Sequence, residues 1–123
     1  MAVPKVFKRE SEVEWENHFM VDGAKIQWIY SPEKDGSPIT VMKVLIDKGV
    51  TLPDHRHPDQ PDLIYPLRGK ATMFIEGEGE FPLEPGMVVQ VPKNALHSIR
   101  RVEEELLLYN VFAPGTPYRP GKK

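Results

Sequence analysis

The sequence of 123 residues contains no cysteine. Disulfide bonds, thiolate metal ligands and cysteine nucleophiles are therefore excluded. A large excess of charge of either sign is also missing, because the formal net charge at pH 7 is -2 and the isoelectric point is near 6.1. Binding of a nucleic acid through a basic surface is thus not expected.

Long apolar runs are missing as well. No stretch approaches the roughly 20 apolar residues of a membrane-spanning helix. Residues 1–14 alternate charges with single apolar residues, unlike the apolar core of a secretory signal. We therefore expect a cytoplasmic protein without a membrane partner. No long helical period is present either, and 13 prolines and nine glycines favour many short segments.

The chain has instead a series of short segments with β-strand character. Alternating apolar residues predict a strand over 25–30 and a longer one over 39–47. Further runs, separated by turn residues, occur at 63–68, 71–75, 80–83, 87–91, 98–102 and 105–112. This series predicts an all-β fold, an antiparallel barrel or jelly roll.

The length fits a single domain over residues 1–123. We divide it into an N-terminal arm or edge strand (1–24), a barrel (25–112) and a C-terminal tail (113–123) rich in proline and glycine. A turn is expected at 31–37, where Ser-Pro and Asp-Gly pairs occur.

Three histidines and a carboxylate indicate a metal site. The i, i+2 spacing of His55 and His57 places both rings on the same side of an extended chain. Asp62 can add an oxygen ligand, and His97, which follows a second apolar segment, can add a third imidazole. A metal-free polar cluster is the alternative.

Other side chains near the histidine pair compete with Asp62 for the fourth position. Asp54, Asp59 and Gln60 are close enough in sequence to supply that ligand. Asp62 is preferred because it stands at the head of an apolar strand, whereas Asp54 and Asp59 have the character of solvated loop acids next to proline.

The same residues resemble the two sequence motifs of the cupin superfamily. The first motif, G-x5-H-x-H-x4-E-x6-G, is matched in every spacing by Gly49, His55, His57, Asp62 and Gly69. The second, G-x5-P-x-G-x2-H-x3-N, is matched in spacing by Gly86, Pro92, Asn94, His97 and Arg101. Three identities depart from the motifs, with Asp62 in place of Glu, Asn94 in place of Gly and Arg101 in place of Asn. Asparagine is the residue after glycine that best tolerates a left-handed turn.

The resemblance spans residues 38–112 and implies a double-stranded β-helix, the jelly-roll barrel of cupins. It also implies a first-row divalent metal held by His55, His57, Asp62 and His97, with two adjacent positions left for water or substrate. As in other small cupins, pairing through an N-terminal strand would give a homodimer.

Three imidazoles and one carboxylate suit manganese, iron, cobalt, nickel, copper or zinc. Because the charges of a divalent ion and one carboxylate sum to +1, such a site favours an anionic or enolisable small molecule. Hydroxy acids, 2-oxo acids and enediols are examples of that class.

Strand parity gives Arg101 a possible role as a substrate anchor. If His97 faces the barrel interior, Arg101 lies on the same face and its guanidinium can hold a carboxylate or phosphate. The alternative is that the strand twists or bulges and that Arg101 pairs at the surface with the acidic run 103–105. By the same counting Tyr65 faces outward, and His18, without a second ligand type at a motif spacing, is expected on the surface.

The leading functional hypothesis is a metalloenzyme that acts on a small oxygenated metabolite. Oxidation of the dioxygenase type and isomerase, epimerase or lyase chemistry both fit a divalent Lewis acid. The competing hypothesis is a non-catalytic cupin that binds or senses a small molecule, because a fold does not decide a function.

Overall fold

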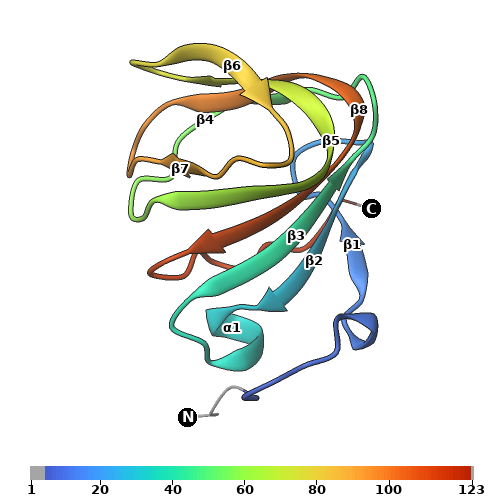
Figure 1. Cartoon of the computed structure of the whole chain (residues 1–123). Coiled ribbons are helices and arrows are strands. Elements are labelled where there is room, and N and C mark those ends of the chain that lie inside the picture. Colours follow the sequence, from blue (N-terminus) through green and yellow to red (C-terminus); the bar gives the residue numbers. More distant parts are fainter. Residues whose placement is uncertain (1–4, 123) are drawn as a thin grey trace.

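Antiparallel strands make up most of the computed structural model, which describes residues 5–122 (Figure 1). In chain order the elements are the 3₁₀ helix η1 (Glu10–Glu12), β1 (Trp15–Asn17), β2 (Ala24–Tyr30), α1 (Pro32–Asp35), β3 (Thr40–Ile46), β4 (Leu52–His55), β5 (Asp62–Ile75), β6 (Gly79–Leu83), β7 (Val89–Val91) and β8 (His97–Phe112). The strand order is β1-β2-β3-β8-β5-β6, with β4 paired to β8 and β7 paired to β5. The expected all-β antiparallel fold is thus confirmed.

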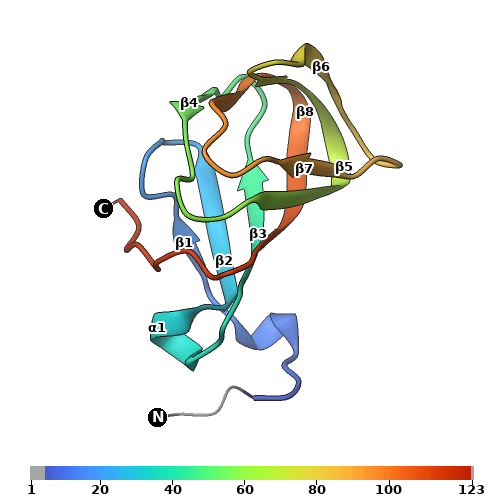
Figure 2. The same ribbon diagram turned by 90° about the vertical axis from the view of Figure 1, so that its left-hand side faces the viewer.

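Two long strands, β5 and β8, run through both halves of the barrel. The first half of β5 and the second half of β8 pair with each other between β7 and β3, whereas their other halves pair between β6 and β4. The bent strands close the sheet into a jelly-roll barrel, seen in Figure 2. The sequence analysis split β5 at Gly69 and β8 near residue 103, but each is one continuous strand.

Gly69 allows β5 to continue through the bend. Its φ of +96° lies in the left-handed region, and a Cβ at this position would collide with the backbone of Glu105 in β8. Only glycine has no Cβ to place there. The last glycine of the first motif therefore does not end a strand but lets two strands approach where both bend.

The interior of the barrel is packed with apolar side chains that alternate along the strands. Met42, Val44 and Ile46 of β3 are buried, as are Ile26 and Trp28 of β2. Each buried side chain of this size contributes roughly 1.5–3 kcal/mol relative to exposure. The core therefore fixes which faces of β2 and β3 point inward, and it surrounds the histidines described below.

The N-terminal segment projects away from the barrel, and β1, which follows it, pairs with β2 (Figure 1). Residues 1–4 of the expected arm and residue 123 of the expected tail lie outside the described residues. The expected turn at 31–37 contains the one-turn helix α1, which Ser31 caps by accepting a hydrogen bond from the Lys34 backbone N–H at 3.1 Å. Within residues 5–122 no helix is long and apolar enough to cross a membrane.

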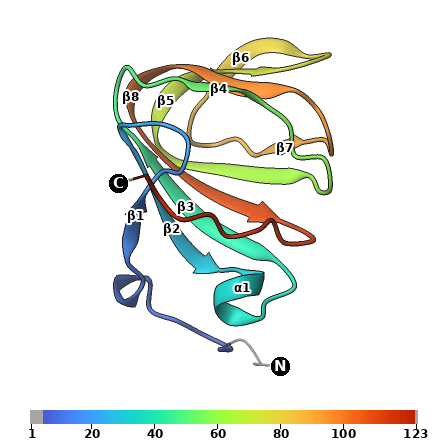
Figure 3. The same cartoon turned by 180° about the vertical axis from the view of Figure 1, so that it is seen from behind.

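The C-terminal tail, residues 113–122, turns back from β8 and crosses to the loop between β1 and β2 (Figure 3). Thr116 donates its backbone N–H to the Thr40 hydroxyl at 2.9 Å. At its far end the Lys122 N–H donates to the carbonyl of His18 at 3.2 Å. These contacts fix the tail against the start of β3 and against the loop between β1 and β2.

Candidate metal centre

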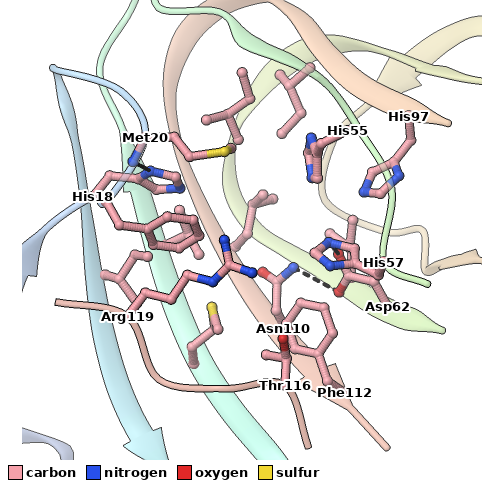
Figure 4. Close-up of a pocket in the computed structure, with 18 of the residues that line it drawn as sticks. His18, Met20, His55, His57, Asp62, His97, Asn110, Phe112, Thr116 and Arg119 are labelled. Atoms are coloured by element: carbon pink, nitrogen blue, oxygen red, sulfur yellow. Dashed lines mark hydrogen bonds and ion pairs between the residues drawn. The ribbon is translucent and has the colours of Figure 1, made fainter. Parts of the chain in front are cut away.

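His55, His57 and His97 converge inside the barrel (Figure 4). One nitrogen of each ring lies within 4.8 Å of the others, and the ring centroids are 4.1–5.1 Å apart. His55 and His97 are directly opposite each other in the pairing of β4 with β8. Residues 42 positions apart in the chain are thereby brought to one point.

The two motif loops are tied to each other next to the histidines. Asn94 has a φ of +63°, the left-handed conformation for which the motif ordinarily uses glycine. In that conformation its N–H donates to the His57 carbonyl at 2.7 Å. The guanidinium of Arg56 donates to the Asn94 carbonyl at 2.7 Å and pairs with Glu76 at 2.9 Å. These bonds fix the loop that carries His57 against the loop that precedes His97.

Backbone carbonyls set the tautomers of two of the rings. Nδ1 of His55 is 2.8 Å from the Pro53 carbonyl, and Nδ1 of His97 is 2.9 Å from the Ala95 carbonyl. Because a carbonyl only accepts, Nδ1 must be the protonated nitrogen, and Nε2 of each neutral ring carries the free lone pair. Backbone contacts of this kind commonly orient metal-binding histidines.

The donor set fits a metal ion. Nε2 of His97 is buried and has no hydrogen-bond partner among the described residues, a costly state for a polar atom that nothing binds. Burial, followed by the charges of His55 and His97, lowers the pKa of His57 to about 3. Burial, followed by the charge of His55, lowers the pKa of His97 to about 4. Both rings are therefore neutral near pH 7, as ligation requires.

Asp62 lies beside the histidine cluster. Its Oδ2 is 3.9 Å from Nε2 of His57, and its Oδ1 accepts a hydrogen bond from the Asn110 amide at 3.0 Å. Two ligand atoms of one ion with bonds of about 2.1 Å are at most about 4.2 Å apart. The distance to His57 is compatible with a shared ion, but Asp62 is not part of the group of ligand atoms that all lie within 4.8 Å of one another, which consists of the three histidines. Burial raises the pKa of Asp62 to about 7, although the bond from Asn110 opposes that shift.

The three competitors for the oxygen position lie elsewhere. Gln60 is buried, but its amide donates to the tail carbonyls of Pro114 and Gly115 at 3.3 and 3.0 Å. Asp54 and Asp59 are exposed and do not line the pocket. Asp62 is the acid that the fold places next to the histidines.

Arg101 points away from the cavity, so the expectation from strand parity is wrong. Across from Thr72 and Met73 of β5, the partners in β8 are Arg101 and Ile99, which leaves Arg100 as an extra residue in a β-bulge. A bulge shifts the alternation by one residue. The Arg101 side chain is 69% exposed and pairs with Glu103 at 3.5 Å, as the alternative interpretation expected.

Three pocket residues were missed by the sequence analysis. His18, expected on the surface, is only 5% exposed and lines the pocket, so all four histidines of the chain surround it. Asn110 comes from the end of β8 and Arg119 from the tail (Figure 4). None of the three belongs to the quoted motifs, and alternation along β8, which puts Asn110 on the face of Leu108 and Phe112, was the only signal for any of them.

The pocket itself is a cavity of about 150 Å³. An engineered apolar cavity of about that volume holds benzene. Its walls are mainly apolar. The three histidines and Asp62 lie on one side, His18 lies on the opposite side, and Arg119 extends from that side toward the Asn110 amide (Figure 4). An apolar pocket with few placed polar groups is typical of a small-molecule site.

Comparisons with known proteins agree with this description. Quercetin 2,3-dioxygenase of Bacillus subtilis (strain 168) is 35% identical over 68 residues, which is 55% of this chain and 20% of that protein. The chain therefore spans about one fifth of the length of that relative.

Solved structures share the fold. KdgF from Halomonas sp. superposes with a TM-score of 0.74 at 22% identity, covering 88% of this chain and 94% of that one. An RmlC-like cupin from Shewanella frigidimarina gives 0.76 at 21% identity, covering 93% and 95%. A predicted oxalate decarboxylase from Thermotoga maritima gives 0.75 at 19% identity, covering 89% and 99%.

The family model described as a cupin domain matches residues 42–112, more than half of the sequence. That stretch contains both motif loops, the three converging histidines and the two strands that close the barrel. The chain belongs to the cupin family.

Proposed function

We propose that this protein is a metal-dependent enzyme that acts on a small oxygenated metabolite. The observation that carries the proposal is the convergence of three imidazoles at the polar end of an apolar cavity, with Nε2 of His97 buried and without a hydrogen-bond partner among the described residues. His55, His57 and His97 would hold a divalent first-row metal, and Asp62 would supply the oxygen ligand.

The metal, when bound, supplies a Lewis acid that polarises an oxygen of the substrate. The rest of the site is provided by this chain. The carbonyls of Pro53 and Ala95 keep two imidazoles in the ligand tautomer. Asn110 orients the Asp62 carboxyl group. The apolar walls exclude water around the reacting end, which strengthens every charge interaction there.

Two reaction classes are supported by different observations. The 35% identity to a quercetin 2,3-dioxygenase over 68 residues supports oxidation with oxygen. The fold shared with a predicted oxalate decarboxylase supports lyase or isomerase chemistry, in which the ion would act as a Lewis acid without oxygen. Both need the same metal site.

Elemental analysis of the purified protein is the first test. We expect about one equivalent of a first-row divalent metal per chain, and a His97→Ala variant that has lost most of it because a ligand is gone. A His18→Gln variant is the matched control, since His18 lines the same pocket outside the cluster, and it should keep its metal. Equal metal contents in the parent and His97→Ala would contradict the assignment.

The metal-loaded protein then separates the reaction classes. Oxygen consumption with diketones, hydroxy acids or phenolic compounds would identify an oxygenase. Turnover of the same compounds without oxygen would identify an isomerase or lyase. Binding without turnover for every metal and compound would favour the non-catalytic, ligand-sensing cupin instead.

A further inference from the structure

The end of the pocket opposite the three histidines carries two hydrogen-bond donors. His18 comes from the loop between β1 and β2, and Arg119 comes from the C-terminal tail (Figure 4). The rest of the cavity is lined mainly by apolar side chains such as Met42, Val44 and Leu108. A ligand that fills the cavity therefore meets polar groups at both of its ends.

His18 presents a donor to the cavity because its tautomer is fixed. The backbone N–H of Met20 donates to Nδ1 of His18 at 3.0 Å. Since an N–H only donates, Nδ1 must carry the lone pair, and the proton of the neutral ring is on Nε2. This is the reverse of His55 and His97, whose Nε2 atoms are the acceptors. Of the four histidines, His18 is thus set apart as a donor.

Arg119 brings a positive charge that no acidic side chain neutralises. Among residues 5–122 it forms no ion pair, whereas four other arginines each pair with a glutamate, namely Arg56, Arg68, Arg100 and Arg101. Its guanidinium points into the pocket (Figure 4), and its charge contributes to the lowered pKa of His57. Arg119 is therefore within electrostatic reach of the histidine cluster.

Phe19 holds both donors in place. The His18 ring stacks on the Phe19 ring with centroids 4.7 Å apart, and the Arg119 guanidinium lies 5.3 Å from the same ring centroid. The loop and the tail are also joined directly. The Lys122 N–H donates to the His18 carbonyl at 3.2 Å, and the Asn17 amide donates to the Lys122 carbonyl at 3.1 Å. The arrangement is built by two segments that are far apart in the sequence, with His18 and Arg119 separated by 101 positions.

We propose that Arg119 and the Nε2–H of His18 form a carboxylate-binding subsite at the end of the pocket opposite the histidine cluster. The inference rests on the proposed function and narrows its substrate class to small diacids, with one oxygenated end at the metal and a carboxylate at Arg119. A planar guanidinium is suited to a carboxylate, and the pairing is strengthened in a pocket with apolar walls.

Paired ligands that differ only at the far end test the subsite. 2-Oxoglutarate and 2-oxopentanoate have the same chain length and the same 2-oxo acid end, but only the former has a second carboxylate. 2-Oxoadipate and 2-oxohexanoate form a second pair, one carbon longer. Dissociation constants are measured by calorimetry on the protein loaded with Mn²⁺ and on the metal-free protein.

For the parent we expect at least one diacid to bind about tenfold more tightly than its monoacid, the typical effect of one charged hydrogen bond. Arg119→Leu should bring the ratio close to one, His18→Phe should reduce it, and Arg119→Lys should keep part of it. Arg101→Leu is the matched control, because it removes an arginine that points to solvent, and it should leave the ratio unchanged.

The two proposals fail in different ways. Monoacid binding that is the same with and without Mn²⁺ would count against the metal site and leave the ratio between diacid and monoacid as the measure of the subsite. A ratio near one in the parent for both pairs, or a ratio that Arg119→Leu does not change, would overturn the subsite. Absence of binding by all four acids would overturn it as well.

Discussion

Asp62 is a carboxyl group with an exposed fraction of only 4%, and its one hydrogen-bond partner among the described residues is Asn110. A buried carboxylate is costly unless a cation or several donors compensate its charge. Without a metal, burial therefore raises the pKa of this group to about 7. A divalent cation at the histidine cluster would compensate the charge. In the metal-free protein the cost of burying the carboxylate should therefore appear as a lower stability to unfolding.

We predict that Asp62→Asn stabilises the metal-free protein at pH 8 but not at pH 4. In the unfolded chain the carboxyl group loses its proton near pH 4, whereas in the folded chain it keeps it up to about pH 7. The stability contributed by the raised pKa is complete below about pH 4 and is lost as the pH rises to 7. The variant avoids that loss, which amounts to at most about 4 kcal/mol.

Urea unfolding of the metal-free parent and variant at pH 4, 6 and 8 measures the effect. Asp59→Asn is the matched control, because Asp59 is an exposed acid in the loop between β4 and β5 and does not line the pocket. Its stability relative to the parent should not vary with pH by more than a few tenths of a kcal/mol. The same constant difference for Asp62→Asn would show that the buried carboxyl group titrates normally.

At the scale of elements, bends in the two long strands decide which side chains reach the site. The alternation of β3 and the spacing of both motifs were read correctly, because those segments are regular or have loops of fixed length. The bulge at Arg100 was not foreseeable from alternation, and it turned Arg101 outward. Likewise the sequence analysis divided β5 into two strands at Gly69. The missing Cβ of this residue instead lets one continuous β5 pass close to β8.

We predict that Gly69→Ala is much more destabilising than Gly77→Ala. Both glycines have φ near +90°, so each substitution carries the left-handed penalty of about 1–2 kcal/mol. Only at Gly69 does the new Cβ also meet backbone, that of Glu105, which side-chain motion cannot relieve; at Gly77 no atom lies within 4 Å. We expect a further loss of at least about 2 kcal/mol.

Thermal and urea unfolding of the two variants give the comparison. Gly77→Ala should remain folded with a modest decrease in stability, whereas Gly69→Ala should be strongly destabilised or fail to fold. Equal losses in the two variants would mean that the close approach of β5 to β8 relaxes at no cost, and that the glycine serves only the backbone conformation.

At the scale of the whole molecule, contacts between distant segments complete the pocket. His18 and Arg119 lie outside both motifs and meet only because the tail crosses to the loop before β2. No local period or spacing in the sequence encodes such a contact, so the histidine cluster was predictable and the opposite end of the pocket was not.

We expect a homodimer in which the N-terminal arm packs against a second copy. Val6 and Phe7 are 96% and 82% exposed on a segment that leads away from the barrel (Figure 1). Adjacent large apolar side chains at such exposure are unusual on a monomer surface and favour a partner. The expected mass in solution is therefore twice the 14.1 kDa of one chain.

Light scattering of the parent and of a Val6→Ser, Phe7→Ser double variant tests the arm. The double variant should have the mass of one chain and an unchanged melting profile for the barrel, because neither side chain belongs to the core. Val88→Ser is the control, since it removes an apolar side chain that is 61% exposed next to β7, away from the arm. A parent that stays at 14.1 kDa at high concentration, or a double variant that stays dimeric, would rule out pairing through the arm.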